Sequence, residues 1–215
     1  MEAKLTNKQL NRLEDGREYR SMVMTVRTAG EDIGEMTVEG YATTFNQPYT
    51  LYDSRYFTVL EQVDPGAFRD CDMSDVIMQY DHEGRVFARN KNGTLSLEVD
   101  DVGLKIRADL SGTDIGRQLY QEIKGGYTDK MSFGFIVAED RREYVEDREN
   151  DHETCTRTLL KISKLYDVSA VSIPANDMTS ISARRFADGV IGEIQAERLK
   201  RADAVRKIKL KLLEV

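Results

Sequence analysis

Cysteine and histidine are scarce in this chain of 215 residues, with two of each. Its two cysteines have no CxxC spacing, which argues against a disulfide framework and a thiolate metal site. Its two histidines form no HExxH pair and are too few for a three-histidine site, so zinc hydrolysis is not expected. A Walker loop, a GxGxxG fingerprint and a GxSxG elbow are also missing. These absences disfavour metal-dependent hydrolases and nucleotide-cradling enzymes.

Long apolar runs are missing as well. The longest covers residues 135–138, far short of the roughly 20 residues that a membrane span needs. The first eight residues contain no apolar segment, so we expect no secretion signal and a cytosolic chain. The net charge of −7 argues against general binding of nucleic acid or anionic membranes by the main body. The charge is uneven, because residues 198–215 hold 7 basic and 2 acidic side chains.

Short strand patterns dominate from residue 21 onward. Residues 1–20 are polar, with three isolated leucines, and are predicted to form a charged arm or short helix outside the core. The strand patterns contain β-branched and apolar residues and are separated by turn signals. The predicted strands cover residues 21–27, 36–45, 55–63, 76–80, 85–89, 94–99, 104–110, 131–138, 157–164 and 165–173.

One helix is predicted among the strands. Thr113 can cap it, apolar residues follow at Ile115, Leu119 and Ile123, and a pair of glycines ends it at residues 125–126. A second helical pattern runs from Ala187 to about residue 206. Residues 207–212 then alternate with period two, and this pattern fits a helix or an extended strand equally well.

Residues 139–153 carry 8 acidic and 3 basic side chains and offer nothing to bury. This composition predicts a solvated loop or a long exposed hairpin tip.

Ser132 is a candidate nucleophile. Bulky residues alternate along its strand and share one face, so Ser132 projects to the other face beside Gly134, which leaves room for an approaching backbone. A nucleophile needs that geometry. Ordinary serines on polar strand faces have the same pattern, and this segment alone favours that interpretation.

His82 is the best candidate for a general base. It follows the strand over residues 76–80, in phase with the apolar positions of that strand. A strand-end histidine bonded to a turn is the commoner case in isolation. However, the other histidine, His152, lies in the charged stretch, so His82 is the base available to a serine.

A carboxylate is needed to hold the imidazole in the correct tautomer. Asp167 interrupts an otherwise neutral strand, where an acid normally requires a partner. The alternative is an edge-strand charge that prevents aggregation. Asp81, Glu83 and Glu153 are weaker candidates, because they lie on turns or in the charged stretch.

A series of short segments stands in a characteristic order between residues 40 and 185. They are Gly40-Tyr41-Ala42 leading to Phe45; Glu61 followed by Pro65-Gly66-Ala67-Phe68; Asp81-His82; Asn92-Gly93-Thr94-Leu95; Gly103-Leu104; Met131-Ser132-Phe133-Gly134-Phe135; Asp167-Val168-Ser169; and Pro174-Ala175-Asn176. In their order and spacing they resemble the prohead (capsid maturation) serine proteases of tailed bacteriophages, whose fold is similar to that of the herpesvirus assemblin protease.

The resemblance implies an α+β, mainly β fold: an assemblin-like antiparallel β-barrel or sheet core with a few surrounding helices. The protease domain would cover residues 21–186, between the arm at residues 1–20 and a basic, helical tail at residues 187–215. The family's histidine falls on His82 and its nucleophile on Ser132. Asp167 stands where members more often have glutamate, so its side chain is one methylene shorter. Backbone N–H groups would stabilise the oxyanion. By analogy with assemblin, Arg184 and Arg185 are possible helpers.

The resemblance also implies a serine endopeptidase with a Ser-His-Asp triad and with no metal or organic cofactor. It would act in the host cytoplasm within the assembling prohead and would cleave the scaffold or the scaffolding segment of the capsid protein, and often itself. Its partners would be the major capsid protein and its scaffolding segment or a separate scaffold protein. No nucleic acid or membrane is expected, and self-association stays open. The alternative is a proteolytically silent assembly protein with the same fold.

Overall fold

A computed structural model describes residues 16–22, 27–28, 36–172 and 181–213. The predicted arm up to residue 15, the middle of the predicted strand 21–27 and the segment 173–176 lie outside the described residues. The elements, in chain order, are β1 (Glu18–Met22), β2 (Arg27–Thr28), β3 (Thr37–Thr44), β4 (Tyr49–Asp53), β5 (Phe57–Val63), β6 (Ile77–Tyr80), β7 (Glu83–Arg89), η1 (Asn90–Asn92), β8 (Leu95–Val99), β9 (Gly103–Asp109), α2 (Asp114–Lys124), β10 (Lys130–Asp147), β11 (His152–Val171) and α3 (Ile181–Leu213).

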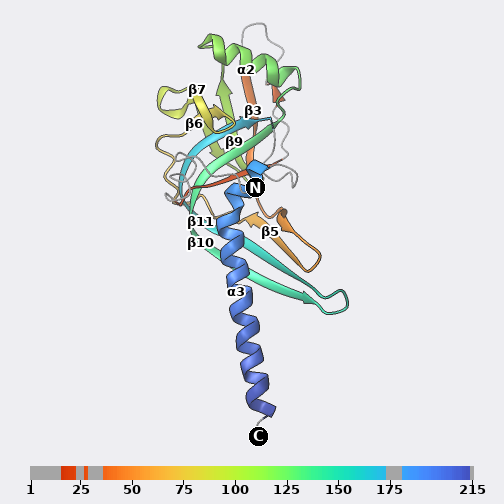
Figure 1. Cartoon of the computed structure of the whole chain (residues 1–215). Helices are drawn as coiled ribbons and strands as arrows, with labels where there is room; N and C mark the ends of the chain where they lie inside the picture. The colour runs from red at the N-terminus through yellow and green to blue at the C-terminus, as the bar shows by residue number, and fades with distance from the viewer. Residues whose placement is uncertain (1–15, 23–26, 29–35, 173–180, 214–215) are drawn as a thin grey trace.

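The strands form two sheets (Figure 1). The larger follows the path β1-β10-β11-β5-β4, with β6 and β7 attached through β11, and the smaller follows β2-β3-β9-β8. A mainly β, α+β fold is therefore confirmed. Of the two expected cores, a barrel or a sheet, the described residues form the second, because both sheets are open paths. The expectation of antiparallel pairing is wrong where β11 pairs parallel with β5 and β6. With 20 residues, β11 is long enough to pair with several strands along its length.

The predicted boundary between arm and core falls inside a strand. Glu18 to Arg20 belong to β1, which pairs antiparallel with β10. Tyr19 and Arg20 are buried, at 2% and 1% exposed. The sequence did not predict this strand, because charged residues are normally exposed. A buried arginine needs partners, and here they come from distant parts of the chain. The strand β4 was also not predicted.

The acidic stretch forms the long hairpin rather than a loop. β10 and β11 pair from Lys130 opposite Val171 to Asp147 opposite His152, and their far end projects from the body (Figure 1). Register shifts interrupt this ladder between residues 134 and 140. The second of the two predicted alternatives, a hairpin, is therefore the correct one.

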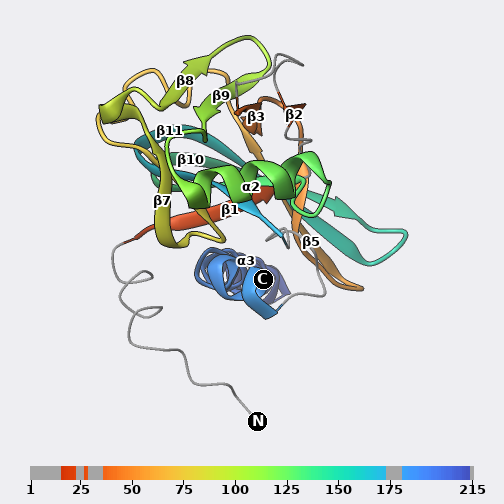
Figure 2. The same cartoon turned by 90° about the horizontal axis from the view of Figure 1, so that it is seen from above.

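Both predicted helices are present. Thr113 caps α2 by accepting a hydrogen bond from the Gly116 backbone N–H, and Leu119 and Ile123 are buried. α3 continues as a helix through the alternating segment to Leu213. Its first half lies beside β1 (Figure 2) and contributes the buried residues Ile191 and Ile194, whereas its second half extends beyond the sheets (Figure 1). Within the described ranges, no helix is both long and apolar enough to cross a membrane.

The main core lies where α2 and the two sheets pack together. β3 contacts β10, and buried residues of β3 and β9 belong to the same core cluster as Phe133, Phe135 and Val168. The two phenylalanine rings are stacked, with centroids 4.4 Å apart. This packing fixes the start of β10 and the end of β11, the part of the hairpin that carries Ser132 and Asp167.

Candidate active site

Two neighbouring strands and the turn after a third hold the three predicted site residues. Ser132 lies on β10 and is paired in register with Ser169 of β11, while Gly134 is paired with Asp167. β6 runs parallel to β11 on its other side, with Met78 opposite Val168, and its end leads directly into His82. The pairing of β10, β11 and β6 thus brings together side chains that are up to 85 residues apart in the sequence.

A continuous hydrogen-bond chain joins these side chains. His82 Nδ1 lies 2.5 Å from Asp167 Oδ1, and His82 Nε2 lies 2.5 Å from Ser132 Oγ. His82 is 7% exposed, Asp167 3% and Ser132 0%. With the carboxylate as acceptor, Nδ1 carries the hydrogen and Nε2 is left to take a proton from the serine. This arrangement is suited to activating a serine hydroxyl for nucleophilic attack.

The turn that presents His82 has an uncommon backbone. Asp81 and His82 have φ values of 48° and 59°, in the left-handed region that residues other than glycine rarely adopt. Two contacts at the end of β11 hold this turn: the Asp81 N–H donates to the Ala170 carbonyl at 3.0 Å, and the N–H of Ser172, which directly follows β11, donates to Asp81 Oδ1 at 3.1 Å. Backbone strain of this kind persists where the surroundings enforce it. Asp81 therefore positions the histidine turn.

Gly134 leaves room for side chains rather than for an approaching backbone. A Cβ at this position would lie 2.3 Å from Asp167 Oδ2 and 2.7 Å from Tyr19 Cε1. The Tyr19 ring packs edge-on against His82, with centroids 4.4 Å apart. Glycine at position 134 therefore allows the acid and the aromatic ring to approach the imidazole from two sides.

Ser169 also contacts the predicted site, and sequence reasoning did not identify it. Its hydroxyl donates to Asp167 Oδ1 at 2.7 Å, the same oxygen that lies against His82, and the residue is fully buried. The alternation of side chains along a strand places residues 167 and 169 on the same face, which was the available signal. Two donors on one carboxylate oxygen fix the orientation of the Asp167 side chain.

Ser132 has a second polar neighbour on β1. Its hydroxyl lies 2.7 Å from the Arg20 carbonyl oxygen, and Ser21 is its partner in the β1–β10 register. No local sequence signal indicated this contact, because the two residues are 112 positions apart.

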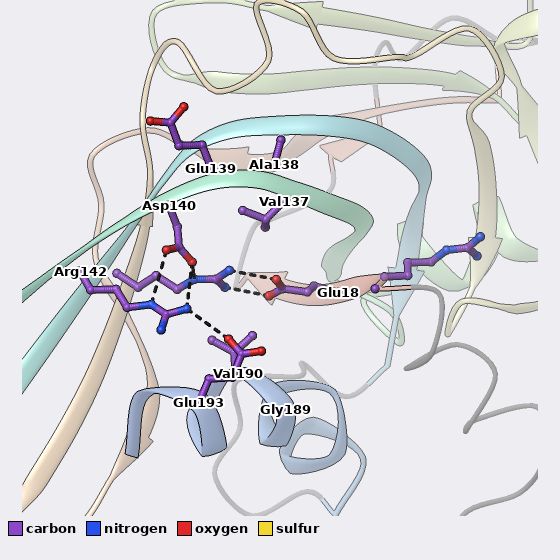
Figure 3. Close-up of a pocket in the computed structure, with 12 residues that line it drawn as sticks. Glu18, Val137, Ala138, Glu139, Asp140, Arg142, Gly189, Val190 and Glu193 are labelled. Carbon is purple, nitrogen blue, oxygen red and sulfur yellow. Dashed lines mark hydrogen bonds and ion pairs between the residues drawn. The ribbon is translucent and has the colours of Figure 1, made fainter. Parts of the chain in front are cut away.

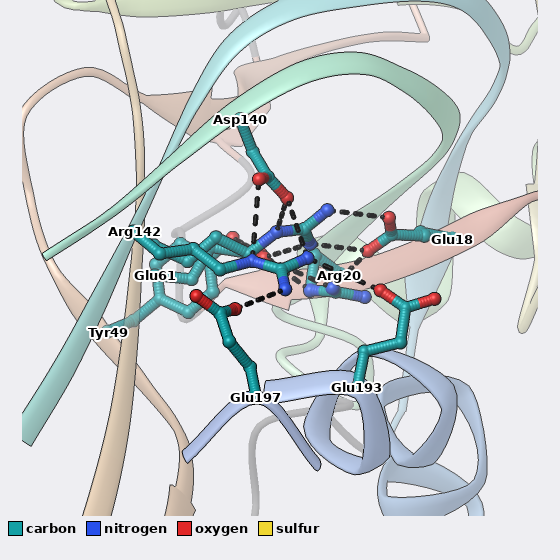
Figure 4. A network of polar contacts seen from close by, with 9 residues as sticks. Glu18, Arg20, Tyr49, Glu61, Asp140, Arg142, Glu193 and Glu197 are labelled. Carbon is teal, nitrogen blue, oxygen red and sulfur yellow. Dashed lines mark hydrogen bonds and ion pairs between the residues drawn. The ribbon is translucent and has the colours of Figure 1, made fainter. Parts of the chain in front are cut away.

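Arg20 belongs to a network of ion pairs that is buried at its centre and ties β1 to the hairpin and to exposed residues of α3 (Figure 4). Arg20 Nε donates to Glu61 at 2.6 Å, and Arg157 donates to Glu61 at 2.7 Å. Burial alone would raise the pKa of Glu61, but the two arginines outweigh it and lower the pKa to about 2. Both arginines also donate to Glu18. Further members are Tyr49, Asp140, Arg142, Glu193 and Glu197.

The other acidic candidates have partners away from Ser132. Glu153 accepts hydrogen bonds from Arg198 and Arg201 of α3, each at 2.5 Å. Glu83 begins β7 and is exposed. Among the described side chains, no group of three or more His, Cys, Asp or Glu residues is arranged to hold a metal ion. The side chains of Arg184 and Arg185 lie outside the described part of the chain.

The two cysteines are not activated as nucleophiles. Burial raises the pKa of the Cys71 thiol to about 11, and burial likewise raises the pKa of the Cys155 thiol. A raised thiol pKa reduces the thiolate that a nucleophile needs. The serine is therefore the better nucleophile candidate.

Comparison with known proteins identifies a serine protease family. The family model described as "Caudovirus prohead serine protease" matches residues 23–190. The prohead protease of Enterobacteria phage HK97 is 29% identical over 156 residues, an alignment that covers 71% of this chain and 61% of that protein. The chain thus spans less than two thirds of the length of this relative. No solved structure matches the chain.

Proposed function

The chain belongs to the caudovirus prohead serine protease family, and on this basis we propose that it is a capsid maturation endopeptidase with Ser132, His82 and Asp167 as its catalytic residues. The observation that carries this proposal is the unbroken hydrogen-bond chain from Asp167 through His82 to Ser132. Its substrates would be the scaffold protein or the scaffolding segment of the capsid protein, and the chain itself. It would act inside the assembling prohead in the host cytoplasm.

In the proposed mechanism, Ser132 Oγ attacks the carbonyl carbon of the scissile peptide bond while its proton passes to His82 Nε2. His82 then gives that proton to the leaving amine, which departs from the acyl-enzyme. Water, activated by His82, hydrolyses the ester and regenerates the serine. Asp167 accepts the Nδ1 hydrogen bond throughout and stabilises the imidazolium that forms. At 2.5 Å, its short side chain reaches the imidazole without the additional methylene of glutamate.

Ser169 would act as a positioning residue. Its hydroxyl donates to the Asp167 oxygen that faces His82, so it restricts rotation of the carboxylate that the imidazole contacts. Backbone N–H groups near Ser132 would stabilise the oxyanion.

A proteolytically silent assembly protein is the second candidate. In that case, the three side chains would be retained for packing only, as buried and mutually satisfied polar groups. Labelling of Ser132 by a fluorophosphonate separates the two, because the reagent requires an activated serine whereas a packing serine does not react.

The decisive experiment is co-expression of the chain with its cognate coat protein, followed by mapping of new coat-protein termini by mass spectrometry. We expect Ser132→Ala and His82→Ala each to abolish these termini without a change in folding, since nucleophile and base act as one unit. Ser96→Ala, which changes an exposed strand serine, is the matched control and should process normally. Normal processing by Ser132→Ala would refute the proposed protease.

A further inference from the structure

The strand β1 lies along the edge of β10 that carries Ser132. The register pairs Arg20 with Phe133 and Ser21 with Ser132, so the Arg20–Ser21 peptide passes beside the hydroxyl. The Arg20 carbonyl oxygen lies 2.7 Å from Ser132 Oγ, and Ser132 has no exposed surface. A substrate carbonyl carbon must come to within about 3–3.5 Å of a nucleophile before attack. With β1 in this position, the approach to Ser132 is closed.

The contact with Arg20 also competes for the serine proton. A hydroxyl has one hydrogen, and two groups that can accept it, His82 Nε2 and the Arg20 carbonyl, lie at 2.5 and 2.7 Å. A proton donated to the carbonyl is not available to the histidine. Nucleophilic attack also requires the lone pair of the Ser132 hydroxyl to point at a carbonyl carbon. In this structure the Ser132 hydroxyl instead contacts the carbonyl oxygen of Arg20. β1 therefore occupies the site in an unproductive arrangement.

Building on the proposed function, we propose that the edge of β10 beside Ser132 is the binding site for an extended peptide substrate, and that β1 occupies this site until it is displaced. An extended segment can add to an exposed strand edge through backbone hydrogen bonds, and alternate side chains then decide which sequences bind. Displacement of β1 would expose the unpaired backbone of β10 and uncover Ser132. It would also remove the Arg20 carbonyl, so that the Ser132 hydroxyl would donate its hydrogen to His82.

A cluster of ion pairs, which we call the clamp, holds β1 in place; it consists of Glu18, Arg20, Glu61 and Arg157, and Glu18 is its most accessible member. Glu18 accepts hydrogen bonds from Arg157 Nη1 and Nη2, at 2.8 and 3.0 Å, and from Arg20. The Glu61 side chain in the centre of this clamp is 0% exposed, whereas that of Glu18 is 14% exposed. Glu18 lines a cavity of about 380 Å³ between the start of β1, β10 and α3 (Figure 3). Glu18 is thus the position at which the docking of β1 can be weakened without touching Ser132, His82 or Asp167.

The test compares fluorophosphonate labelling rates of Ser132 in the full-length chain and in Glu18→Gln. Removing the negative charge weakens the two partly buried, charge-assisted hydrogen bonds by which Arg157 of β11 holds Glu18, so we expect Glu18→Gln to be labelled roughly tenfold faster. Glu193→Gln is the matched control. It lines the same cavity but contacts Arg142 instead of β1, so its labelling rate should equal that of the unmodified chain. A rate for Glu18→Gln equal to or below that of the unmodified chain would overturn the proposal, because β1 would then be an integral part of the site.

A disulfide provides a second test if Glu18→Gln does not fold. Met22 and Met131 are paired in register, at the separation of adjacent strand residues that a disulfide can bridge. In the double variant Met22→Cys/Met131→Cys, the oxidised form should label at least tenfold more slowly than the reduced form, while reductant leaves the unmodified chain unchanged. Equal rates in the two redox forms would overturn the proposal. Absence of Ser132 labelling in every folded form would instead refute the protease itself, and this inference with it.

Discussion

Replacing Gly134 by alanine tests whether close packing around Asp167 sustains the proposed catalysis. The added Cβ would lie 2.3 Å from Asp167 Oδ2 and 2.7 Å from the Tyr19 ring. Ordinary van der Waals contact begins at 3.4 Å. The carboxylate must therefore retreat by about 1 Å or rotate away. It cannot move freely, because His82 and Ser169 both hold its other oxygen.

The expected effect follows from the geometry. A displacement of about 1 Å would lengthen the 2.5 Å contact between Asp167 and His82 to the limit of a hydrogen bond. Misplacement of this size costs about 10²-fold in rate, and overpacking a buried position costs about 1–3 kcal/mol of stability. We therefore expect Gly134→Ala to fold with a lowered melting temperature and to process the coat protein about a hundredfold more slowly.

The assay measures coat-protein processing and Ser132 labelling, together with thermal unfolding. Gly112→Ala is the control, since nothing lies within 4 Å of a Cβ at that position and its φ is not in the left-handed region. It should match the unmodified chain in rate. Activity within a factor of about two of the unmodified chain for a folded Gly134→Ala protein would refute the argument that this packing positions the acid.

Three further predictions concern the acid, the ion-pair network and α3. Asp167→Asn should lower the processing rate by up to about 10⁴-fold, because the amide can donate a hydrogen bond where the imidazole needs an acceptor. An unchanged rate would show that Asp167 is not the catalytic acid, and Glu83 and Glu153 would be tested next. The pKa of Glu61 is lowered from 4.5 to about 2, so its contribution of up to about 3 kcal/mol is complete above pH 4.5 and is lost as the pH falls toward 2. Urea unfolding at pH 3 and pH 6 should therefore show a smaller pH effect in Glu61→Gln than in the unmodified chain, and an equal effect would contradict this assignment. Truncation after Arg185 should lower both the melting temperature and the rate of peptide cleavage, because it removes the buried residue Ile194. Truncation after Ala202 should leave both unchanged. The shorter truncation therefore tests separately whether the basic end of α3 delivers the protein to an acidic scaffold surface. Equal stability after both truncations would contradict the packing role of α3.

Local sequence patterns predicted the elements whose signals lie within a few residues. The α2 limits followed from a capping threonine, apolar residues four apart and a terminal glycine, and the structure has the same cap and end. The strands β5 to β9 followed from alternation and turn signals. The acidic stretch left two alternatives open, because charge alone does not distinguish a loop from a hairpin whose strands are exposed.

Part of the candidate site could be predicted from the small number of histidines and from the resemblance to a protease family. With two histidines in the chain, a base for a serine had few candidates, and Asp167 stood out as an acid in a neutral strand. The structure brings these three residues into one hydrogen-bond chain. Ser169 was within reach of the same reasoning, because it lies two positions from Asp167 on the same strand face.

The involvement of β1 was decided by the tertiary structure. Residues 18–20 are charged and polar, and their own sequence indicates an exposed segment. Tyr19 and Arg20 are buried and Glu18 is partly buried, because Arg20 contacts Glu61, which is 41 residues away, and Glu18 contacts Arg157, which is 139 residues away. Ion pairs over such separations leave no periodic signal in the sequence. The sequence alone therefore determined which residues were chemically suited to the proposed serine protease site. The long-range pairing of β1 with β10 determined that Ser132 has no exposed surface.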